Sequence, residues 1–266
     1  MGLFTGTVFS RALNMDTSVG VILPQDSRYH RGAQPFPEGV TRRSRPRTLI
    51  LLHGLTDNWS AWAYRSRILS YAEEYDTAVV IPEVQRSFYQ DMACGEAYFS
   101  YVYDELPELA AQLFRLSVAP EDLMVAGLSM GGYGALRCAL TGPGRYRAVG
   151  AFSSVTDLEA FTLRMPVRKE THNFERVVKA MFGEAGRIPE DALLDALAER
   201  AAAGEARTPI MMTCGTEDEL YPDNTAMYGR LKALGWPVTL DAMPGIHEWG
   251  FWDRSVRMFL ERFARD

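Results

Sequence analysis

The chain has 266 residues, a formal net charge of −6, 47% hydrophobic residues and 23% charged residues. This length and composition predict one folded domain over residues 1–266, with a substantial core and little room for a second domain. Acidic and basic residues are interspersed, so the charge gives no reason to expect nucleic acid or an anionic membrane as a partner.

The three cysteines, Cys94, Cys138 and Cys214, show no CxxC pairing. This argues against a disulfide framework and a zinc site, and we expect neither a metal nor a cofactor. The N-terminus lacks a cationic start followed by an apolar stretch, and no apolar run approaches membrane-spanning length. The expected location is therefore cytoplasmic, without membrane contact.

Short apolar runs bounded by Gly, Pro or polar residues predict the strands of a sheet. Two of them, Gly6–Ser10 and Ser18–Leu23, precede a long loop rich in Gly, Pro and Arg. Later runs are continuous, which is typical of strands buried on both faces, although the last alternates in part. They are Thr48–Leu52, Ala78–Ile81, Leu123–Ala126, Ala148–Phe152, Pro209–Thr213 and Val238–Met243.

Segments with helical spacing separate most of these strands. The clearest are Ala61–Tyr75, Tyr101–Leu116, Gly131–Leu140, Asn224–Leu234 and Trp249–Phe263. Strands that alternate with helices predict an α/β fold with a mostly parallel central sheet, helices on both faces and an antiparallel N-terminal edge.

One stretch interrupts the alternation. From Val155 to about Ala203 the sequence has helical patterns, at Phe174–Phe182 and Ala192–Ala203, but no good strand. An insertion after a central strand could form a helical cap over a site, here at about residues 155–203. It could equally be an ordinary pair of surface helices, and the residues do not decide between the two.

The most informative motif is Gly127-Leu128-Ser129-Met130-Gly131, which matches the nucleophile elbow G-x-S-x-G. In such a turn the serine sits between strand and helix, and small flanking residues let the backbone close tightly. The pattern alone is weak. Here it lies between a predicted buried strand and a predicted helix, which favours Ser129 as a nucleophile over an incidental serine in a Gly-rich turn.

A serine nucleophile needs a base, and the chain has four histidines, at positions 30, 53, 172 and 247. His247 follows the last predicted strand and precedes the last helix, where the order Ser, Asp, His places the base. His53 directly follows a buried strand, and we expect it to hydrogen-bond its loop. His30 lies in an early loop and His172 in the insertion.

The acid that orients the base should follow a strand between the nucleophile and the histidine. Gly215-Thr216-Glu217-Asp218 does so, and the spacing from Gly215 favours Asp218, with Glu217 as the runner-up. The oxyanion of the reaction needs preset backbone N–H donors. We expect these from Met130, after the nucleophile, and from Leu55, in the loop after an early strand.

Residues near these loops could line a substrate pocket. The candidates are Gly54, which lets its carbonyl turn away from the site, and the aromatic residues Trp59, Tyr89 and Trp249. Each aromatic residue could equally belong to the core.

Together the motifs resemble those of the esterase D family, nearest to its bacterial tributyrin-esterase branch. They are the segments Leu52–Trp59, Ser87–Asp91, Gly127–Ala135, Gly215–Asp218 and Gly245–Trp249, so the resemblance covers nearly the whole chain. It implies an α/β-hydrolase fold and a cofactor-free Ser-His-Asp esterase of short-chain acyl esters, often in a cytoplasmic homo-oligomer. It also implies that Ser129, Asp218 and His247 form the triad and that Leu55 and Met130 supply the oxyanion donors.

Two alternatives stay open. The same family includes S-formylglutathione hydrolases, which typically carry Cys shortly after the oxyanion Gly, whereas this chain has Thr56-Asp57-Asn58 there. This difference argues against a glutathione thioester as substrate. A non-catalytic binding protein of the same fold is the other alternative, and the intact set of candidate residues argues against it.

Overall fold

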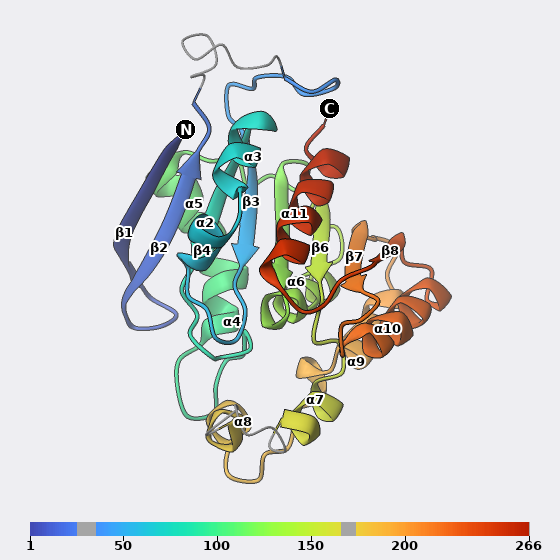
Figure 1. Cartoon of the computed structure of the whole chain (residues 1–266). Helices are drawn as coiled ribbons and strands as arrows, with labels where there is room; N and C mark the ends of the chain where they lie inside the picture. Colours follow the sequence, from blue (N-terminus) through green and yellow to red (C-terminus); the bar gives the residue numbers. More distant parts are fainter. Residues whose placement is uncertain (26–35, 166–173, 266) are drawn as a thin grey trace.

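An eight-stranded sheet runs through the centre of the computed structural model, which describes residues 1–25, 36–165 and 174–265 (Figure 1). The strand order is β1-β2-β4-β3-β5-β6-β7-β8. Strand β2 is antiparallel to both β1 and β4, and the other neighbours are parallel. The strands are β1 (Gly2–Ser10), β2 (Met15–Leu23), β3 (Arg47–Leu52), β4 (Thr77–Pro82), β5 (Leu123–Leu128), β6 (Ala148–Phe152), β7 (Ile210–Gly215) and β8 (Val238–Met243).

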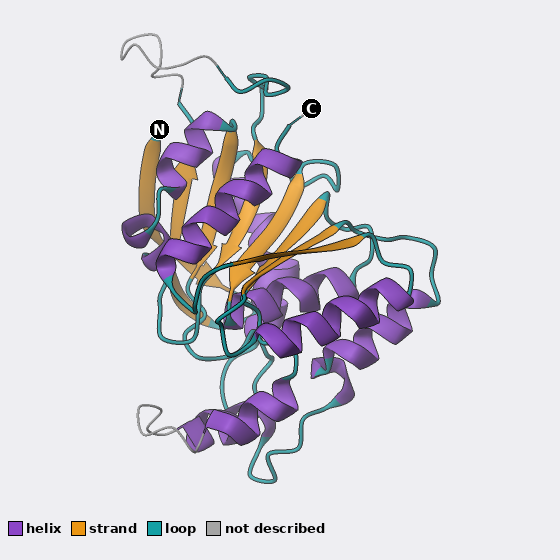
Figure 2. Cartoon of the chain, turned by 45° about the vertical axis from the view of Figure 1, so that its right-hand side comes forward, coloured by secondary structure: helices purple, strands orange, loops and turns teal. Residues whose placement is uncertain are grey.

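The predicted α/β fold with an antiparallel N-terminal edge is confirmed. Every residue of β3 to β7 is buried, as their continuous apolar runs predict, because helices cover both faces of the sheet (Figure 2). The edge strand β1 is mostly exposed. Of the four histidines, His30 and His172 fall outside the described residues.

The helices lie on both sides of the sheet. Those on one face are α2 (Ala61–Arg65), α3 (Ile68–Glu74) and α11 (Trp249–Phe263). The others are α4 (Tyr98–Ser100), the π-helical turn η1 (Tyr101–Glu105), α5 (Leu106–Phe114), α6 (Met130–Thr141), α7 (Leu158–Arg164), α8 (Phe174–Phe182), the 3₁₀ turn η3 (Glu190–Ala192), α9 (Leu194–Ala202) and α10 (Tyr221–Ala233).

The prediction of one helix over Ala61–Tyr75 was wrong, because the helix is interrupted at Ser66. Ser66 is extended, its hydroxyl donates to the Trp62 carbonyl (2.6 Å), and its oxygen accepts from the Ile68 N–H (3.2 Å). One side chain thus satisfies a carbonyl at the end of α2 and an N–H at the start of α3. Serine favours such caps, whereas apolar periodicity continues across the break.

The segment after Val155 contains one helix that the sequence did not reveal. Helix α7 begins after Asp157, whose carboxylate accepts from the Ala160 N–H (2.8 Å). The predicted helix over Phe174–Phe182 is confirmed as α8, and that over Ala192–Ala203 is confirmed in large part as α9. Helices α7 and α8 lie beyond the C-terminal ends of the parallel strands (Figure 1).

The turn from β5 to α6 packs against the end of β3 with almost no space between the backbones. A Cβ atom on Gly131 would lie 2.4 Å from the Leu52 carbonyl oxygen, and one on Gly127 would lie 2.4 Å from the Gly131 carbonyl oxygen. That same Leu52 carbonyl accepts a hydrogen bond from the Trp62 indole (3.0 Å), which fixes its position. Glycine is therefore required on both sides of Ser129.

We predict that Gly131→Ala destabilises the protein by about 3 kcal/mol or more, because the methyl group forces two backbone segments apart. Gly229→Ala in α10 is the matched control, since a Cβ there meets nothing within 4 Å. It should stabilise by about 0.5–1 kcal/mol. Urea unfolding of both variants tests this, and equal effects would contradict the role assigned to Gly131.

Candidate active site

Ser129 occupies a strained turn between β5 and α6. Its backbone has φ +53° and ψ −113°, a conformation that non-glycine residues rarely adopt. The turn is held by hydrogen bonds from the Ser129 N–H to the Phe152 carbonyl (2.8 Å) and from the N–H groups of Tyr133 and Val155 to the Ser129 carbonyl (3.1 and 3.2 Å). This backbone geometry is that of a nucleophile elbow.

The structure brings the three predicted triad side chains together. His247 Nε2 lies 3.1 Å from the Ser129 hydroxyl oxygen, and His247 Nδ1 lies 2.9 Å from Asp218 Oδ2. The side chain of Asp218 is fully buried and that of His247 is 31% exposed. The His247 ring also packs nearly perpendicular to the Trp252 ring, with ring centroids 4.9 Å apart. In this arrangement the imidazole can take a proton from the serine while the carboxylate fixes its orientation.

Asp218 stays charged in spite of its burial. Burial acts to raise its pKa, but the hydrogen bond and charge of His247 and the Leu220 N–H (2.9 Å) favour the carboxylate, and the net effect lowers the pKa. The carboxylate is thus available to stabilise an imidazolium at His247.

Glu217, the runner-up for the acid, points elsewhere. Its carboxylate accepts from the Gly245 N–H (2.6 Å), and its own N–H donates to the Gly245 carbonyl (3.1 Å). The Gly245 hydrogen bond and a second one from the Thr216 hydroxyl lower the pKa of Glu217. Glu217 therefore ties the loop of the acid to the loop of His247, a positioning role that the sequence did not reveal.

The loop after β3 carries the predicted oxyanion donor Leu55. His53 donates from Nδ1 to the Gly54 carbonyl (2.8 Å) and accepts at Nε2 from the Val84 N–H (3.2 Å), as the sequence predicted for a loop-bonding histidine. The Gly54 carbonyl also accepts from the Asp57 N–H (3.2 Å), so two donors hold it. Among the described residues, no hydrogen-bond partner is recorded for the Leu55 N–H.

The second predicted oxyanion donor is the N–H of Met130. Met130 is the first residue of α6, so its N–H has no partner within the helix. It directly follows Ser129, and Leu55 lines the same cavity as Ser129. Both predicted donors thus belong to segments beside the candidate nucleophile.

A cavity of about 180 Å³ lies beside Ser129 and His247. Its walls come from the oxyanion loop, the acid loop, α7 and α11. The described lining residues are Gly54, Leu55, Thr56, Asp57, Leu128, Ser129, Phe161, Met165, Glu219, Leu220, His247 and Trp252.

Of the four predicted pocket residues, only Gly54 belongs to the described lining of this cavity. The Trp59 indole lies against the Gly20 backbone of β2. Tyr89 is fully buried, and its hydroxyl donates to the His53 carbonyl (2.9 Å). Trp249 packs edge-to-face on Trp62 and Trp252, with centroids 5.2 and 5.4 Å apart. These three aromatic side chains therefore pack on neighbouring backbone and rings and do not belong to the described lining of the cavity.

Part of the apolar lining that the sequence missed comes from α7 and the residue after it. Phe161 on this helix and Met165 just after it reach the cavity beside Ser129. Phe161 itself packs on Phe88 and on Phe174 of α8, with centroids 5.6 and 5.7 Å apart. Only the helical pattern of the insertion signalled that it could cover a site, because these contacts join residues far apart in the sequence.

Within the described ranges, no group of three or more His, Cys, Asp or Glu side chains is placed to hold a metal ion. Nor does any described helix have the length and apolar character needed to cross a membrane.

Comparison with known proteins places the chain among the serine hydrolases that act on ester bonds. The structure is similar to that of the fluorophosphonate-binding serine hydrolase FphF of Staphylococcus aureus, with a TM-score of 0.85 and 26% identity over 100% of this chain and 99% of that one. It is also similar to the S-formylglutathione hydrolase FrmB of the same species, with a TM-score of 0.83 and 26% identity over 99% of both chains.

The model of the putative esterase family matches residues 10–256, and the chain belongs to this family. An acetyl esterase of Caldicellulosiruptor saccharolyticus is 29% identical in sequence. The alignment covers 100% of this chain and 99% of the acetyl esterase. The predicted esterase resemblance and the prediction of a serine carboxylesterase are thereby confirmed.

His53 provides a prediction about pH. Its pKa is lowered because burial disfavours the imidazolium more than the Gly54 carbonyl and the Glu83 and Asp57 carboxylates favour it. A histidine whose pKa is lower in the folded state contributes stability above its unfolded pKa and loses it as the pH falls. The free energy of unfolding should therefore decrease below about pH 6.5, by up to about 1.4 kcal/mol per pH unit from this residue.

Urea unfolding at several pH values between neutral and mildly acidic measures this slope. His53→Asn removes the titrating group, so its free energy of unfolding should depend less steeply on pH, whatever its absolute stability. Identical slopes for the two proteins would show that His53 is not the group responsible.

Proposed function

We propose that the protein hydrolyses short-chain acyl esters through an acyl-enzyme intermediate on Ser129. The observation that carries this proposal is the unbroken series of hydrogen-bond distances from Asp218 through His247 to Ser129. The position of Ser129 at a strained elbow, beside a small cavity, also supports the proposal. Membership of the putative esterase family provides an independent argument.

The first half of the reaction forms the acyl-enzyme. His247 Nε2 takes the proton of the Ser129 hydroxyl as the oxygen attacks the ester carbonyl, and the Leu55 and Met130 N–H groups bind the oxyanion. The imidazolium then protonates the leaving alcohol as the ester C–O bond breaks. Asp218 stabilises the imidazolium throughout, consistent with its lowered pKa.

The second half releases the acid. Water gives a proton to His247 and attacks the acyl carbonyl, and the proton returns to Ser129 as the acyl–serine bond breaks. The same two backbone donors bind the second oxyanion. Because His53 and Asp57 both hold the Gly54 carbonyl, the Leu55 N–H stays aimed without reorganisation.

The cavity dimensions support a short acyl group. Its volume of about 180 Å³ is below the roughly 300–1,000 Å³ typical of sites for drug-sized ligands. Phe161 and Met165 of the insertion form part of its wall, which supports a capping role for α7 over the site. Substrates with long acyl chains would have to displace these side chains.

A glutathione thioester is the second candidate substrate, because FrmB and a relative from Paracoccus denitrificans are named S-formylglutathione hydrolases. Asp57 opposes it. This carboxyl lines the cavity and is half-buried. A carboxylate in the cavity repels a leaving group that itself carries carboxylates, so we favour neutral oxygen esters.

The cytoplasm is the compartment we propose, since Cys94, Cys138 and Cys214 are all free thiols, as is common in reducing compartments. A homo-oligomer is the proposed assembly. Its support is the exposed apolar side chains of the edge strand β1, namely Leu3, Phe4 and Phe9.

The first test is hydrolysis of p-nitrophenyl esters from acetate to long acyl chains. The rate should fall steeply beyond short chains, because the cavity is small and Phe161 and Met165 form part of its wall. Ser129→Ala should retain less than about a thousandth of the wild-type rate, the usual cost of losing a triad member. A higher residual rate would refute Ser129 as the nucleophile, and a matched pair of oxygen and sulfur esters separates esterase from thioesterase.

The assignment of the acid is tested by a pair of neighbouring isosteric variants. Asp218→Asn should lower kcat by about 10⁴-fold, because an amide favours the wrong tautomer of His247. Glu217→Gln should cost about tenfold or less, because a glutamine oxygen can still accept from the Gly245 N–H. Steady-state kinetics on one ester decides, and the reverse ranking would move the acid to Glu217.

A further inference from the structure

A second cavity, larger than the one at Ser129, lies between the loop after β4 and helices α6, α8 and α9. Its volume is about 400 Å³, and none of its described lining residues belongs to the cavity at Ser129. Three arginines, Arg137, Arg187 and Arg200, face it together with apolar side chains that include Phe99, Met181 and Leu197. In a chain with a net charge of −6, three guanidinium groups around one cavity form a local concentration of positive charge.

Arg137 is a buried cation with one long ion pair, to an exposed carboxylate. It is only 5% exposed, and its guanidinium carbon lies 4.0 Å from the centre of the Phe99 ring. Nη1 donates to the Tyr89 carbonyl (2.7 Å) and to the Gln90 side chain. The nearest described carboxylate, that of Asp191, lies 3.8 Å from Nη2 and is 63% exposed, and Nε has no hydrogen-bond partner in the described part of the chain.

Arg187 and Arg200 add two further positive charges at the cavity. Both are exposed, and neither forms an ion pair within the described ranges. The other carboxylate at the cavity is that of Asp91, which already accepts from the N–H (2.9 Å) and the hydroxyl (2.7 Å) of Ser100. The cavity therefore has more cationic groups than available anions.

A buried charge is costly unless a counter-charge and hydrogen bonds compensate it. Guanidinium groups bind carboxylate and phosphate with paired, charge-assisted hydrogen bonds. We propose that this cavity binds an organic anion. Its carboxylate or phosphate group is held by Arg187 and Arg200 next to Arg137, and its apolar part packs on Phe99, Met181 and Leu197.

Isothermal titration calorimetry with benzoate and with phenyl phosphate tests the proposal. At least one of these probes should bind the wild-type protein, and binding should weaken as salt is added. Arg187→Gln/Arg200→Gln should weaken binding by about tenfold or more, since it removes two charge-assisted contacts. Both side chains are exposed, so this variant is expected to fold.

Arg45→Gln/Arg257→Gln is the matched control. It removes the same charge from exposed positions that do not line the cavity, Arg257 lying on α11, across the sheet from α6. Its affinity for the probe should equal that of the wild type. No binding of either probe at millimolar concentration, or equal binding by Arg187→Gln/Arg200→Gln and the control, would overturn the proposal.

Discussion

The contact between the turn at Ser129 and the end of β3 is the constraint on which the rest of the site depends. Because Gly131 lies against the Leu52 carbonyl, α6 starts at the point where the oxyanion loop leaves the sheet. The Ser129 hydroxyl, the Met130 N–H and the Leu55 loop thus meet at the C-terminal ends of the parallel strands. The left-handed backbone of Ser129 is the cost of this contact, and the hydrogen bonds from β6 and α6 compensate it.

The acid and the base lie at the same end of the sheet, on separate loops that follow the C-terminal ends of β7 and β8. Parallel pairing places the ends of these strands side by side, and the Thr216 N–H donates to the Met243 carbonyl (2.9 Å) one step beyond the sheet. Glu217 then binds Gly245, so each loop limits the freedom of the other. Two adjacent carboxylates therefore do different work: one fixes the loop of His247, and its buried neighbour Asp218 contacts the imidazole.

Local signals made much of this predictable. Continuous apolar runs marked the buried strands, and the chain order of Ser129, Asp218 and His247 indicated which residues the sheet would bring together. Side-chain direction in the loops was not predictable, and Trp59 and Tyr89 show why. Each follows a strand end, as a pocket residue would, but turns toward a partner distant in sequence, Gly20 or His53. The wall at Phe161 depended on a helix whose start is set by a single Asp cap.

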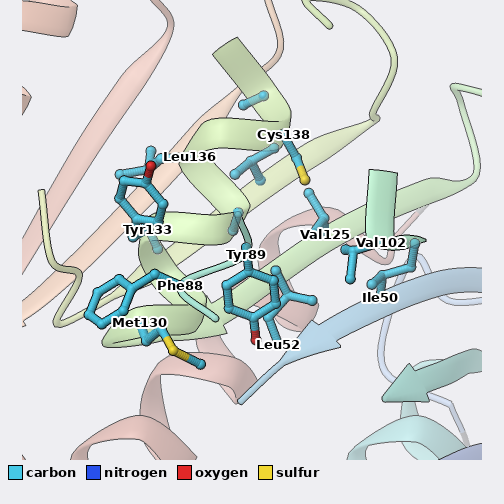
Figure 3. Packing of buried hydrophobic residues seen from close by; sticks show 14 of the residues in the cluster. Ile50, Leu52, Phe88, Tyr89, Val102, Val125, Met130, Tyr133, Leu136 and Cys138 are labelled. Atoms are coloured by element: carbon cyan, nitrogen blue, oxygen red, sulfur yellow. The ribbon is translucent and has the colours of Figure 1, made fainter. Parts of the chain in front are cut away.

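Tyr89 contacts both the oxyanion loop and Arg137 at the second cavity. Figure 3 shows its ring beside α6, near Phe88, with its hydroxyl toward the end of β3. The hydroxyl holds the His53 carbonyl, while its backbone carbonyl accepts from Arg137, two turns along α6 from Ser129. The residue that braces the oxyanion loop therefore also contacts the buried cation of the second cavity. Tyr89 is thus a hydrogen-bond partner shared by the oxyanion loop, through the His53 carbonyl, and by Arg137 on α6.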